Sequence, residues 1–135
     1  MKYLLDTNIC IYIIKKSPAS VIKKFHSLAI GDIGISTVTL AELEYGVAKS
    51  AYKHKNQEAL INFVIPLEIL DFDANAASTY GKIRAELERT GKPIGSMDMM
   101  IAAHALAMNV VLVTNNEKEF VRIKGIQLEN WVSSD

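Results

Sequence analysis

Cysteine is nearly absent from this 135-residue sequence, which contains Cys10 alone and only three prolines. One cysteine can form neither an intrachain disulfide nor a zinc site built on several thiolates. No uninterrupted apolar run approaches the roughly 20 residues that a membrane-spanning helix needs. The apolar N-terminus is interrupted by Asp6 and Asn8, which argues against a signal peptide. We therefore expect a cytoplasmic protein that has no membrane segment.

An excess of either charge is also lacking, since 15 basic residues balance 15 acidic ones. This balance argues against a strongly basic DNA-coating protein, and it leaves open how charge is distributed locally. Half of the residues are hydrophobic, so the chain can bury a substantial core. The length fits a single domain over residues 1–135.

Short apolar strands alternate with helical segments along the chain. We predict strands at 2–6, 33–36, 67–70, 110–113 and 126–131. We predict helices at 7–15, 17–28, 37–50, 54–65, 73–90, 97–108 and 116–121. For the second helix, Ser17 is the expected N-cap and Pro18 the expected first residue. This alternation predicts an α/β fold with a mostly parallel central sheet.

Two polar residues follow predicted strands directly. Asp6 ends the first strand and Thr114 ends the fourth. Ligands of parallel sheets bind outside the carboxyl ends of the strands. We therefore expect Asp6 and Thr114 to face one shared crevice.

Three acids stand out by position, and each also has an ordinary structural interpretation. Asp6 and Asp98 could simply stabilise helix N-termini, with Ser96 as the N-cap before Asp98, and Glu42 could be an exposed helical residue. Carboxylates that converge on one crevice raise each other's pKa unless a cation neutralises them. Oxygen ligands without cysteine suit Mg²⁺ or Mn²⁺, the usual ions of phosphoryl chemistry.

Two acids remain ambiguous from the residues alone. Periodicity does not separate Glu42 from Glu44, which lie on different faces of the same predicted helix. Glu119 could complete a capping box with Asn116, or it could join the acidic site.

Other catalytic schemes fit poorly. The three histidines are scattered, and His104 lies on a predicted buried helix, which favours a core role. There is no serine-hydrolase GxSxG motif and no phosphate-binding glycine loop. Cys10 is expected to pack inside a helix, because nothing near it in the sequence would lower its pKa.

Several stretches together resemble the PIN-domain toxins of bacterial VapBC toxin–antitoxin pairs. "YLLDTNICIYIIK", "ISTVTLAELEYG" and "IGSMDMMIAAHALAMNVVLVTNNEKEF" occur in the order and at the spacing of that family's motifs, and "LENW" matches a common ending. The similarity extends over nearly the whole chain. It implies an α/β/α sandwich with a central, mostly parallel sheet.

The resemblance also implies an activity, namely Mg²⁺- or Mn²⁺-dependent endonucleolytic cleavage of RNA that stops translation. Enteric-type members cleave initiator tRNA in the anticodon loop, which favours that substrate here. Asp6 and Asp98 match the principal metal ligands, Glu42 the third acid and Glu119 a less uniform fourth. The implied supporting polar residues are Thr7, Asn8, Thr114, Asn115 and Asn116. Many PIN domains carry an aspartate where this chain has Asn115 and Asn116, so the number of metal ions stays open.

Partners follow from the same resemblance. A cognate VapB-type antitoxin would cover the groove and place a basic side chain in the acidic pocket, and such toxins commonly form homodimers and toxin–antitoxin hetero-oligomers. Five cations are candidates to hold RNA phosphates, namely Lys15, Lys16, Lys49, Arg84 and Lys92.

Two alternatives remain at this stage. A phosphoacceptor signalling domain would use Asp71 or Asp73 after the third strand, although no lysine follows a matching fifth strand. The other alternative is a non-catalytic PIN-like module that binds RNA or protein.

Overall fold

A five-stranded parallel sheet forms the centre of the computed structural model, which describes residues 1–133. Its strands are β1 (Tyr3–Leu5), β2 (Ile33–Ser36), β3 (Glu68–Leu70), β4 (Val111–Val113) and β5 (Leu128–Glu129). The spatial order is β3-β2-β1-β4-β5, and every pairing is parallel. The chain therefore builds outward from β1 on one side and then returns to its other side with β4. This confirms the predicted α/β fold.

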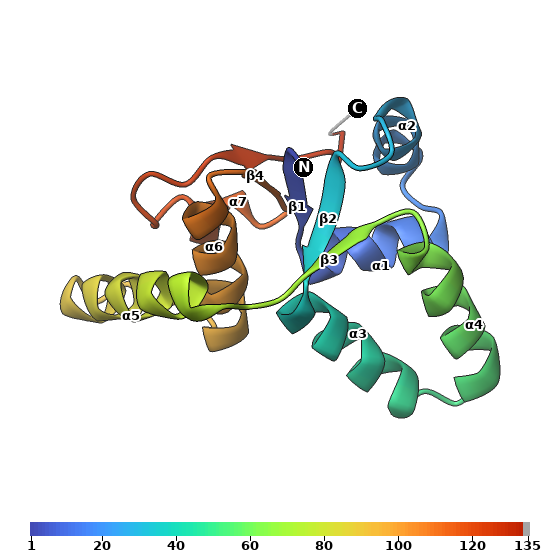
Figure 1. Ribbon diagram of the computed structural model, residues 1–135, viewed down its shortest axis with the longest axis horizontal. Helices are drawn as coiled ribbons and strands as arrows, with labels where there is room; N and C mark the ends of the chain where they lie inside the picture. Colours follow the sequence, from blue (N-terminus) through green and yellow to red (C-terminus); the bar gives the residue numbers. More distant parts are fainter. Residues whose placement is uncertain (134–135) are drawn as a thin grey trace.

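Helices cover both faces of the sheet (Figure 1). They are α1 (Thr7–Lys15), α2 (Ala19–Ser27), α3 (Thr37–Ala48), α4 (Lys53–Val64), α5 (Ala74–Arg89), α6 (Ser96–Met108) and α7 (Glu117–Phe120). In Figure 1, α1 to α4 lie to the right of the strands and α5 to α7 to the left. The structure thus has the predicted helix–sheet–helix layers. No helix within residues 1–133 combines the length and the apolar character needed to cross a membrane.

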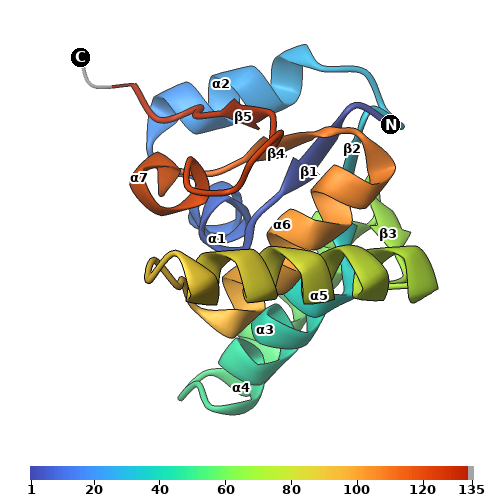
Figure 2. The same ribbon diagram turned by 90° about the vertical axis from the view of Figure 1, so that its left-hand side faces the viewer.

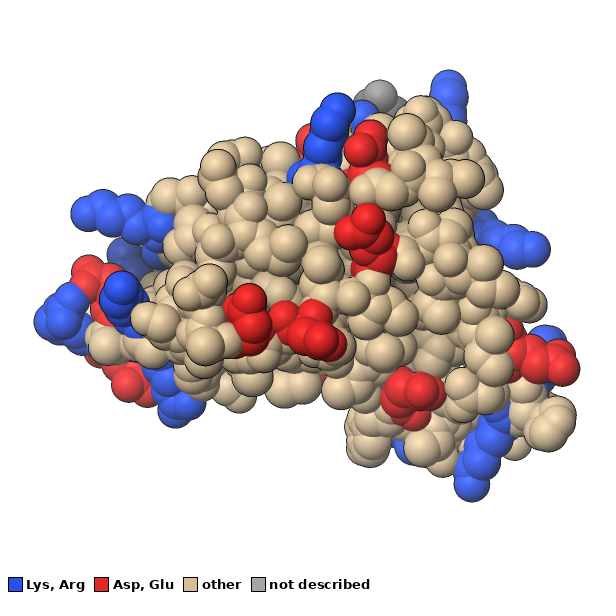
Figure 3. Space-filling view, viewed as in Figure 1, with Lys and Arg blue, Asp and Glu red and all other residues tan. Residues whose placement is uncertain are grey.

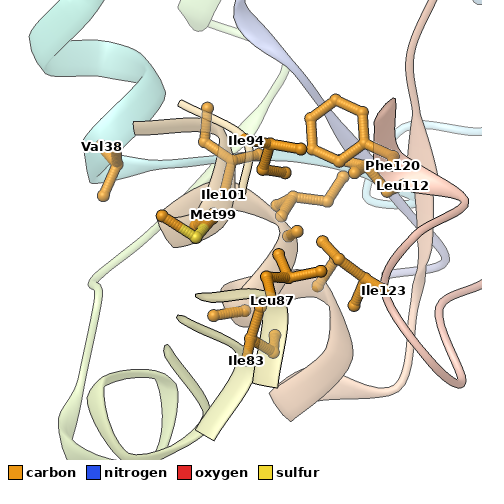
Figure 4. Packing of buried hydrophobic residues seen from close by; sticks show 13 residues of the cluster. Val38, Ile83, Leu87, Ile94, Met99, Ile101, Leu112, Phe120 and Ile123 are labelled. Atoms are coloured by element: carbon orange, nitrogen blue, oxygen red, sulfur yellow. The ribbon is translucent and has the colours of Figure 1, made fainter. Parts of the chain in front are cut away.

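Apolar side chains of the strands alternate between the two faces of the sheet, so each face has its own hydrophobic core. Leu4 and Leu112 belong to the cluster under α5 and α6, whereas their neighbours Leu5 and Val113 belong to the cluster under α1 to α4. Side chains at successive strand positions point to opposite faces, so one short apolar strand serves both cores. Figure 4 shows the first cluster, in which residues of α5 and α6 meet Phe120 and Ile123.

The helix α6 is buried along most of its length, as its apolar sequence predicts. Residues 101–105 are all buried, and they include His104. The Nδ1 atom of His104 lies 2.8 Å from the Ser36 hydroxyl, so the ring has a polar partner in the core. Burial lowers the pKa of His104, while the charges of Asp73 and Asp71 act in the opposite direction. The prediction of His104 as a satisfied core residue is confirmed.

Two predicted N-caps are wrong. The helix α2 begins at Ala19 with Pro18 as its N-cap, and no side chain caps it, so Ser17 lies outside the helix. The Pro18 carbonyl accepts from the amides of Val21 and Ile22, which satisfies these donors without a serine. The helix α6 begins at Ser96, and its N-cap is Gly95 rather than Ser96.

Element boundaries otherwise match the predictions to within a few residues. The largest difference is β5, expected at 126–131 and observed only at Leu128–Glu129. The Asn130 side chain accepts from the amide of Val132 at 2.9 Å. Such an Asx-type bond favours a turn over continued strand pairing, which explains the early end.

Gly34 in β2 provides a test of sheet packing. A Cβ atom at this position would lie 2.9 Å from the Glu68 carbonyl oxygen and against the Met1 sulfur. We expect Gly34→Ala to lower the free energy of unfolding by roughly 1–3 kcal/mol, because β2 and β3 must separate. Urea unfolding monitored by circular dichroism measures this change.

The matched control is Gly81→Ala in α5, where a Cβ would have no neighbour within 4 Å. Alanine is the better helix former, so this control should gain about 0.5–1 kcal/mol. Equal effects of both substitutions would contradict the proposed close approach at Gly34.

Candidate active site

Asp6 follows β1 directly and is the N-cap of α1. Its Oδ1 accepts from the backbone amide of Ile9 at 2.9 Å, and its side chain is only 4 % exposed. The Thr114 hydroxyl donates a second hydrogen bond to the carboxylate. The ordinary interpretation of Asp6 as a helix cap is therefore correct, and the cap also ties β1 to the end of β4.

The shared crevice predicted for Asp6 and Thr114 is present. The strands β1 and β4 are neighbours, with Leu5 opposite Val113, so the residues that follow them leave the sheet at the same edge. The chain changes direction between these two strands, which is the topological switch point where parallel sheets bind ligands. Thr114 is fully buried there.

Glu42 reaches this edge from α3. Its Oε1 accepts from the Thr7 hydroxyl at 2.5 Å, which joins α3 to the first turn of α1. Glu44, by contrast, is exposed and lies 3.4 Å from the side-chain amide of Gln57 on α4. The structure therefore selects Glu42 and places Glu44 on the outer surface.

Asp98 lies in the first turn of α6 and is half-buried. A carboxylate in this position is stabilised by the helix dipole. A Cβ atom added to Gly95, the N-cap, would lie 3.8 Å from Asp98 Oδ2, so the backbone passes close to the carboxylate.

Glu119 belongs to the short helix α7, and the capping box predicted for it is wrong. The side chain of Asn116 caps no amide; instead its Nδ2 donates to Glu119 Oε2 at 2.8 Å. The Thr114 hydroxyl in turn accepts from the Asn116 amide at 2.9 Å. Asn116 therefore orients Glu119 relative to the end of β4.

Electrostatics connect the four acids. Burial raises the pKa of Asp6 to about 6, and the charges of Asp98 and Glu42 add to this rise, whereas the hydrogen bonds from Thr114 and Ile9 oppose it. Burial also raises the pKa of Asp98, with further contributions from Glu42 and Glu119. The charge of Glu42 thus acts on Asp6 and Asp98, and that of Glu119 acts on Asp98, which places the four carboxylates near one another at this edge of the sheet.

The four acids lie near one another, but this alone does not make them ligands of one metal ion. No group of three or more His, Cys, Asp or Glu side chains in residues 1–133 is already arranged as a metal cage. Three of the carboxylates instead accept hydrogen bonds from local donors, namely Thr7, Asn116 and the Ile9 amide. These side chains would have to reorient to direct their oxygens at a common ion. The donor set itself consists of oxygen only, which fits Mg²⁺ or Mn²⁺.

A row of neutral polar side chains borders the site, and sequence reasoning found only part of it. The Asn115 amide donates to the Tyr12 hydroxyl at 3.3 Å, and Asn130 donates to Asn115 Oδ1 at 3.1 Å. Asn8 is exposed in the first turn of α1. Tyr12 and Asn130 were not predicted, because only the fold brings α1 and the end of β5 beside Asn115.

The five predicted phosphate-binding cations have different surroundings. Lys15 lines a hollow together with Glu42, and Lys16 lines a separate one between α1, α2 and α4. The Lys49 ammonium lies 4.9 Å from the Tyr45 ring centroid, and the Arg84 side chain pairs with Glu88 on α5. Lys92 is exposed in the connection from α5 to α6. Only Lys15 therefore shares a hollow with one of the acids.

The phosphoacceptor alternative does not fit the fold. Asp71 and Asp73 follow β3, an edge strand separated from β1 by β2, and Asp73 caps α5 by accepting from the Ala76 amide. Cys10 is fully buried, and burial together with the Asp6 charge raises the pKa of its thiol. The prediction that Cys10 packs inside a helix is confirmed.

In the metal-free protein, the buried carboxylate of Asp6 should make the free energy of unfolding depend on pH. Since its folded-state pKa is about 6 against an ordinary value of 3.8, its contribution to stability is present below about pH 4 and is lost as pH rises through about 6. Asn is also a good N-cap, so Asp6→Asn should raise the free energy of unfolding at pH 7.5 by up to about 3 kcal/mol and change it little at pH 4. Urea unfolding in EDTA at both pH values measures this.

The control is Asp73→Asn, which alters an exposed N-cap and should change stability little at either pH. An Asp6→Asn effect of the same size at both pH values would contradict the buried-charge interpretation.

Comparison with known proteins agrees with this geometry. The family model described as the PIN domain matches residues 3–126. The chain is 52 % identical to "Ribonuclease VapC2" of Rickettsia felis over 97 % of this chain and 98 % of that protein. It is 48 % identical to "tRNA(fMet)-specific endonuclease VapC" of Shigella flexneri over 97 % of this chain and 98 % of that protein.

A solved structure shows the same fold. The crystal structure of VapBC2 from Rickettsia felis bound to a DNA fragment from its promoter contains a chain with a TM-score of 0.92 and 50 % identity, covering 98 % of this chain and all of that one. Identity at this level over the full length extends to the activity class as well as the fold. The chain therefore belongs to the PIN-domain family and, within it, to the VapC-type ribonuclease toxins of VapBC toxin–antitoxin systems.

Proposed function

We propose that this chain is a metal-dependent endoribonuclease that inhibits translation by cutting structured RNA, with the anticodon loop of initiator tRNA as its substrate. The observation that carries the proposal is the convergence of Asp6, Glu42, Asp98 and Glu119 on one crevice, where their charges are mutually coupled. The relative in Shigella flexneri, which is named a tRNA(fMet)-specific endonuclease, supports the choice of substrate.

The four acids provide oxygen ligands suited to Mg²⁺, with Mn²⁺ as a substitute. Asp6 and Asp98 would hold the ion, and Glu42 and Glu119 would complete its shell or orient the attacking water. A bound divalent ion lowers the pKa of water and offsets charge on the phosphate during hydrolysis. The same ion would counteract the burial and the charge repulsion that together raise the pKa of Asp6 and Asp98.

Neighbouring side chains keep the acids in working orientations. The Ile9 amide and Thr114 orient Asp6, Thr7 orients Glu42 and Asn116 orients Glu119, so these three carboxylates have defined hydrogen-bond donors. Glu42 and Glu119 are the acids placed to accept a proton from the attacking water. Hydrolysis by water leaves a 5′-phosphate and a 3′-hydroxyl and needs no 2′-hydroxyl nucleophile. Preference for RNA then comes from shape and from access to unstacked bases in loops.

Cleavage of purified tRNA in Mg²⁺ tests these assignments. Asp98→Asn and Glu42→Gln should each lower kcat/KM by about 100- to 1,000-fold, because each removes a carboxylate that would hold the metal ion or orient the attacking water. Glu44→Gln is the matched control on the same helix and should stay within about twofold of the wild type. EDTA should abolish cleavage, Mn²⁺ should restore it, and the products should carry 5′-phosphates.

Cleavage that survives both EDTA and Asp6→Asn would defeat the metal hypothesis. Equal losses from Glu42→Gln and Glu44→Gln would remove Glu42 from the site. If the wild type binds tRNA tightly but never cuts it, the non-catalytic RNA-binding module becomes the better description.

We also propose a cognate VapB-type antitoxin as the protein partner. A hollow of about 590 Å³ lies between α1, α2 and α4 and is lined by apolar side chains that include Ile14, Ile22, Phe25 and Phe63. It shares Ile14 and Ala59 with the hollow that contains Glu42. An amphipathic antitoxin helix fits the first hollow, and a following segment could carry a basic side chain to Glu42.

Co-expression with a VapB-type antitoxin tests this partner. Ile14→Glu should weaken antitoxin capture at least about tenfold, because it places a charge in an apolar contact. Met108→Glu, at the end of α6, is the matched control and should leave capture unchanged. Both variants should still cleave tRNA, and retention of full capture by Ile14→Glu would contradict this site.

Homodimerisation and single-domain organisation stay predictions.

A further inference from the structure

A second groove lies on the opposite side of the sheet from the antitoxin hollow. It has a volume of about 440 Å³ and runs between α5, α6 and the turn after α7. In Figure 2, α5 lies across the front of the molecule, with α7 and the following turn above it. Ile83, Leu87 and Ile123 form its floor, and Figure 4 shows these three side chains close together. We call it the α5–α7 groove.

The rim of the α5–α7 groove is basic. Lys82, Arg122 and Lys124 line it, and none of the three forms an ion pair with a carboxylate in the described part of the chain. Glu86 also lines the groove, but it is already paired with Arg89. Figure 3 shows the blue side chains that gather at the left end of the molecule, where the C-terminal part of α5 lies. The groove therefore carries positive charge that the protein itself leaves largely unneutralised.

Arg122 connects this groove to the acidic site. Its Nη1 donates to the Pro93 carbonyl at 3.2 Å, and from Pro93 the chain leads into the first turn of α6 and Asp98. Its backbone amide donates to the Glu119 carbonyl at 3.1 Å, so Arg122 lies one turn beyond that acid. The hydrogen bond to a neutral carbonyl thus fixes the guanidinium without pairing it with a carboxylate.

A polyanionic substrate needs such cations. The chain has no net charge, and its active site gathers four carboxylates that repel phosphates. The apolar floor can contact ribose and base faces while the rim pairs with phosphates.

We propose that the α5–α7 groove holds the RNA backbone on one side of the scissile bond, with Arg122 as the positioning residue nearest the active site. The inference rests on the ribonuclease function proposed above. It identifies the surface that holds the RNA strand beside the active site. Arg122, Lys82 and Lys124 each bind a phosphate of the strand. None of them takes part in the chemical step.

Binding of fluorescent tRNA in EDTA, in the Asp98→Asn background, tests the groove without cleavage. The triple variant Lys82→Gln/Arg122→Gln/Lys124→Gln should raise Kd by about 10- to 100-fold and lower the slope of log Kd against log salt by about 2–3. Lys82→Gln/Lys124→Gln, which keeps the Arg122 contact to Pro93, removes two of the three cations and should show about two thirds of that slope change. The charge-retaining variant Lys82→Arg/Arg122→Lys/Lys124→Arg should bind within about threefold of its parent.

The matched control is Lys23→Gln/Lys53→Gln/Lys55→Gln, which removes three exposed lysines of α2 and α4. An equal loss in this control would show non-specific attraction and overturn the proposal, as would an unchanged Kd and salt slope in the groove variant. In the active enzyme, the groove variant should raise KM and keep kcat within about twofold. If the wild type never cuts tRNA but the binding results are as expected, the proposed ribonuclease function is contradicted, whereas the proposed role of the groove in RNA binding is retained.

Discussion

The structure depends on a carboxylate that is buried at the end of the central strand. Asp6 must leave β1, cap α1 and accept from Thr114 of the neighbouring strand, all with almost no exposure to solvent. These contacts bind the sheet, the first helix and the end of β4 into one unit. They do not fully compensate the charge, because the pKa of Asp6 still rises to about 6. The fold therefore retains a destabilising buried carboxylate at a position where it can bind a cation.

The other acids follow the same pattern. Each of Glu42 and Glu119 has one local donor and some exposure, so each is oriented without being neutralised. The donors come from residues next to the crevice in sequence or in space, namely Thr7 and Asn116. Three of the four carboxylates, those of Asp6, Glu42 and Glu119, therefore have a polar partner in the protein itself.

The two faces of the sheet carry different surfaces around this site. Apolar hollows lie between α1, α2, α3 and α4, and one of them includes Glu42, whereas cations line the α5–α7 groove, and one of these, Arg122, contacts Pro93 in the segment that leads to α6. A protein of zero net charge can in this way present an apolar surface to a protein and a basic one to RNA. The two proposed surfaces lie on opposite faces of the sheet, so the protein partner and the RNA would approach the molecule from different sides.

The sequence by itself determined the order of strands and helices, because period-2 and helical apolar patterns are local properties. It also indicated Asp6, Asp98 and the crevice at the carboxyl edge of the sheet, since topology follows from the α/β alternation. It misplaced two helix N-caps by one residue each, at Ser17 rather than Pro18 and at Ser96 rather than Gly95. It could not separate Glu42 from Glu44 or find Tyr12, Asn130 and Arg122. Only the tertiary structure decided these, because each depends on a contact between elements that are distant along the chain.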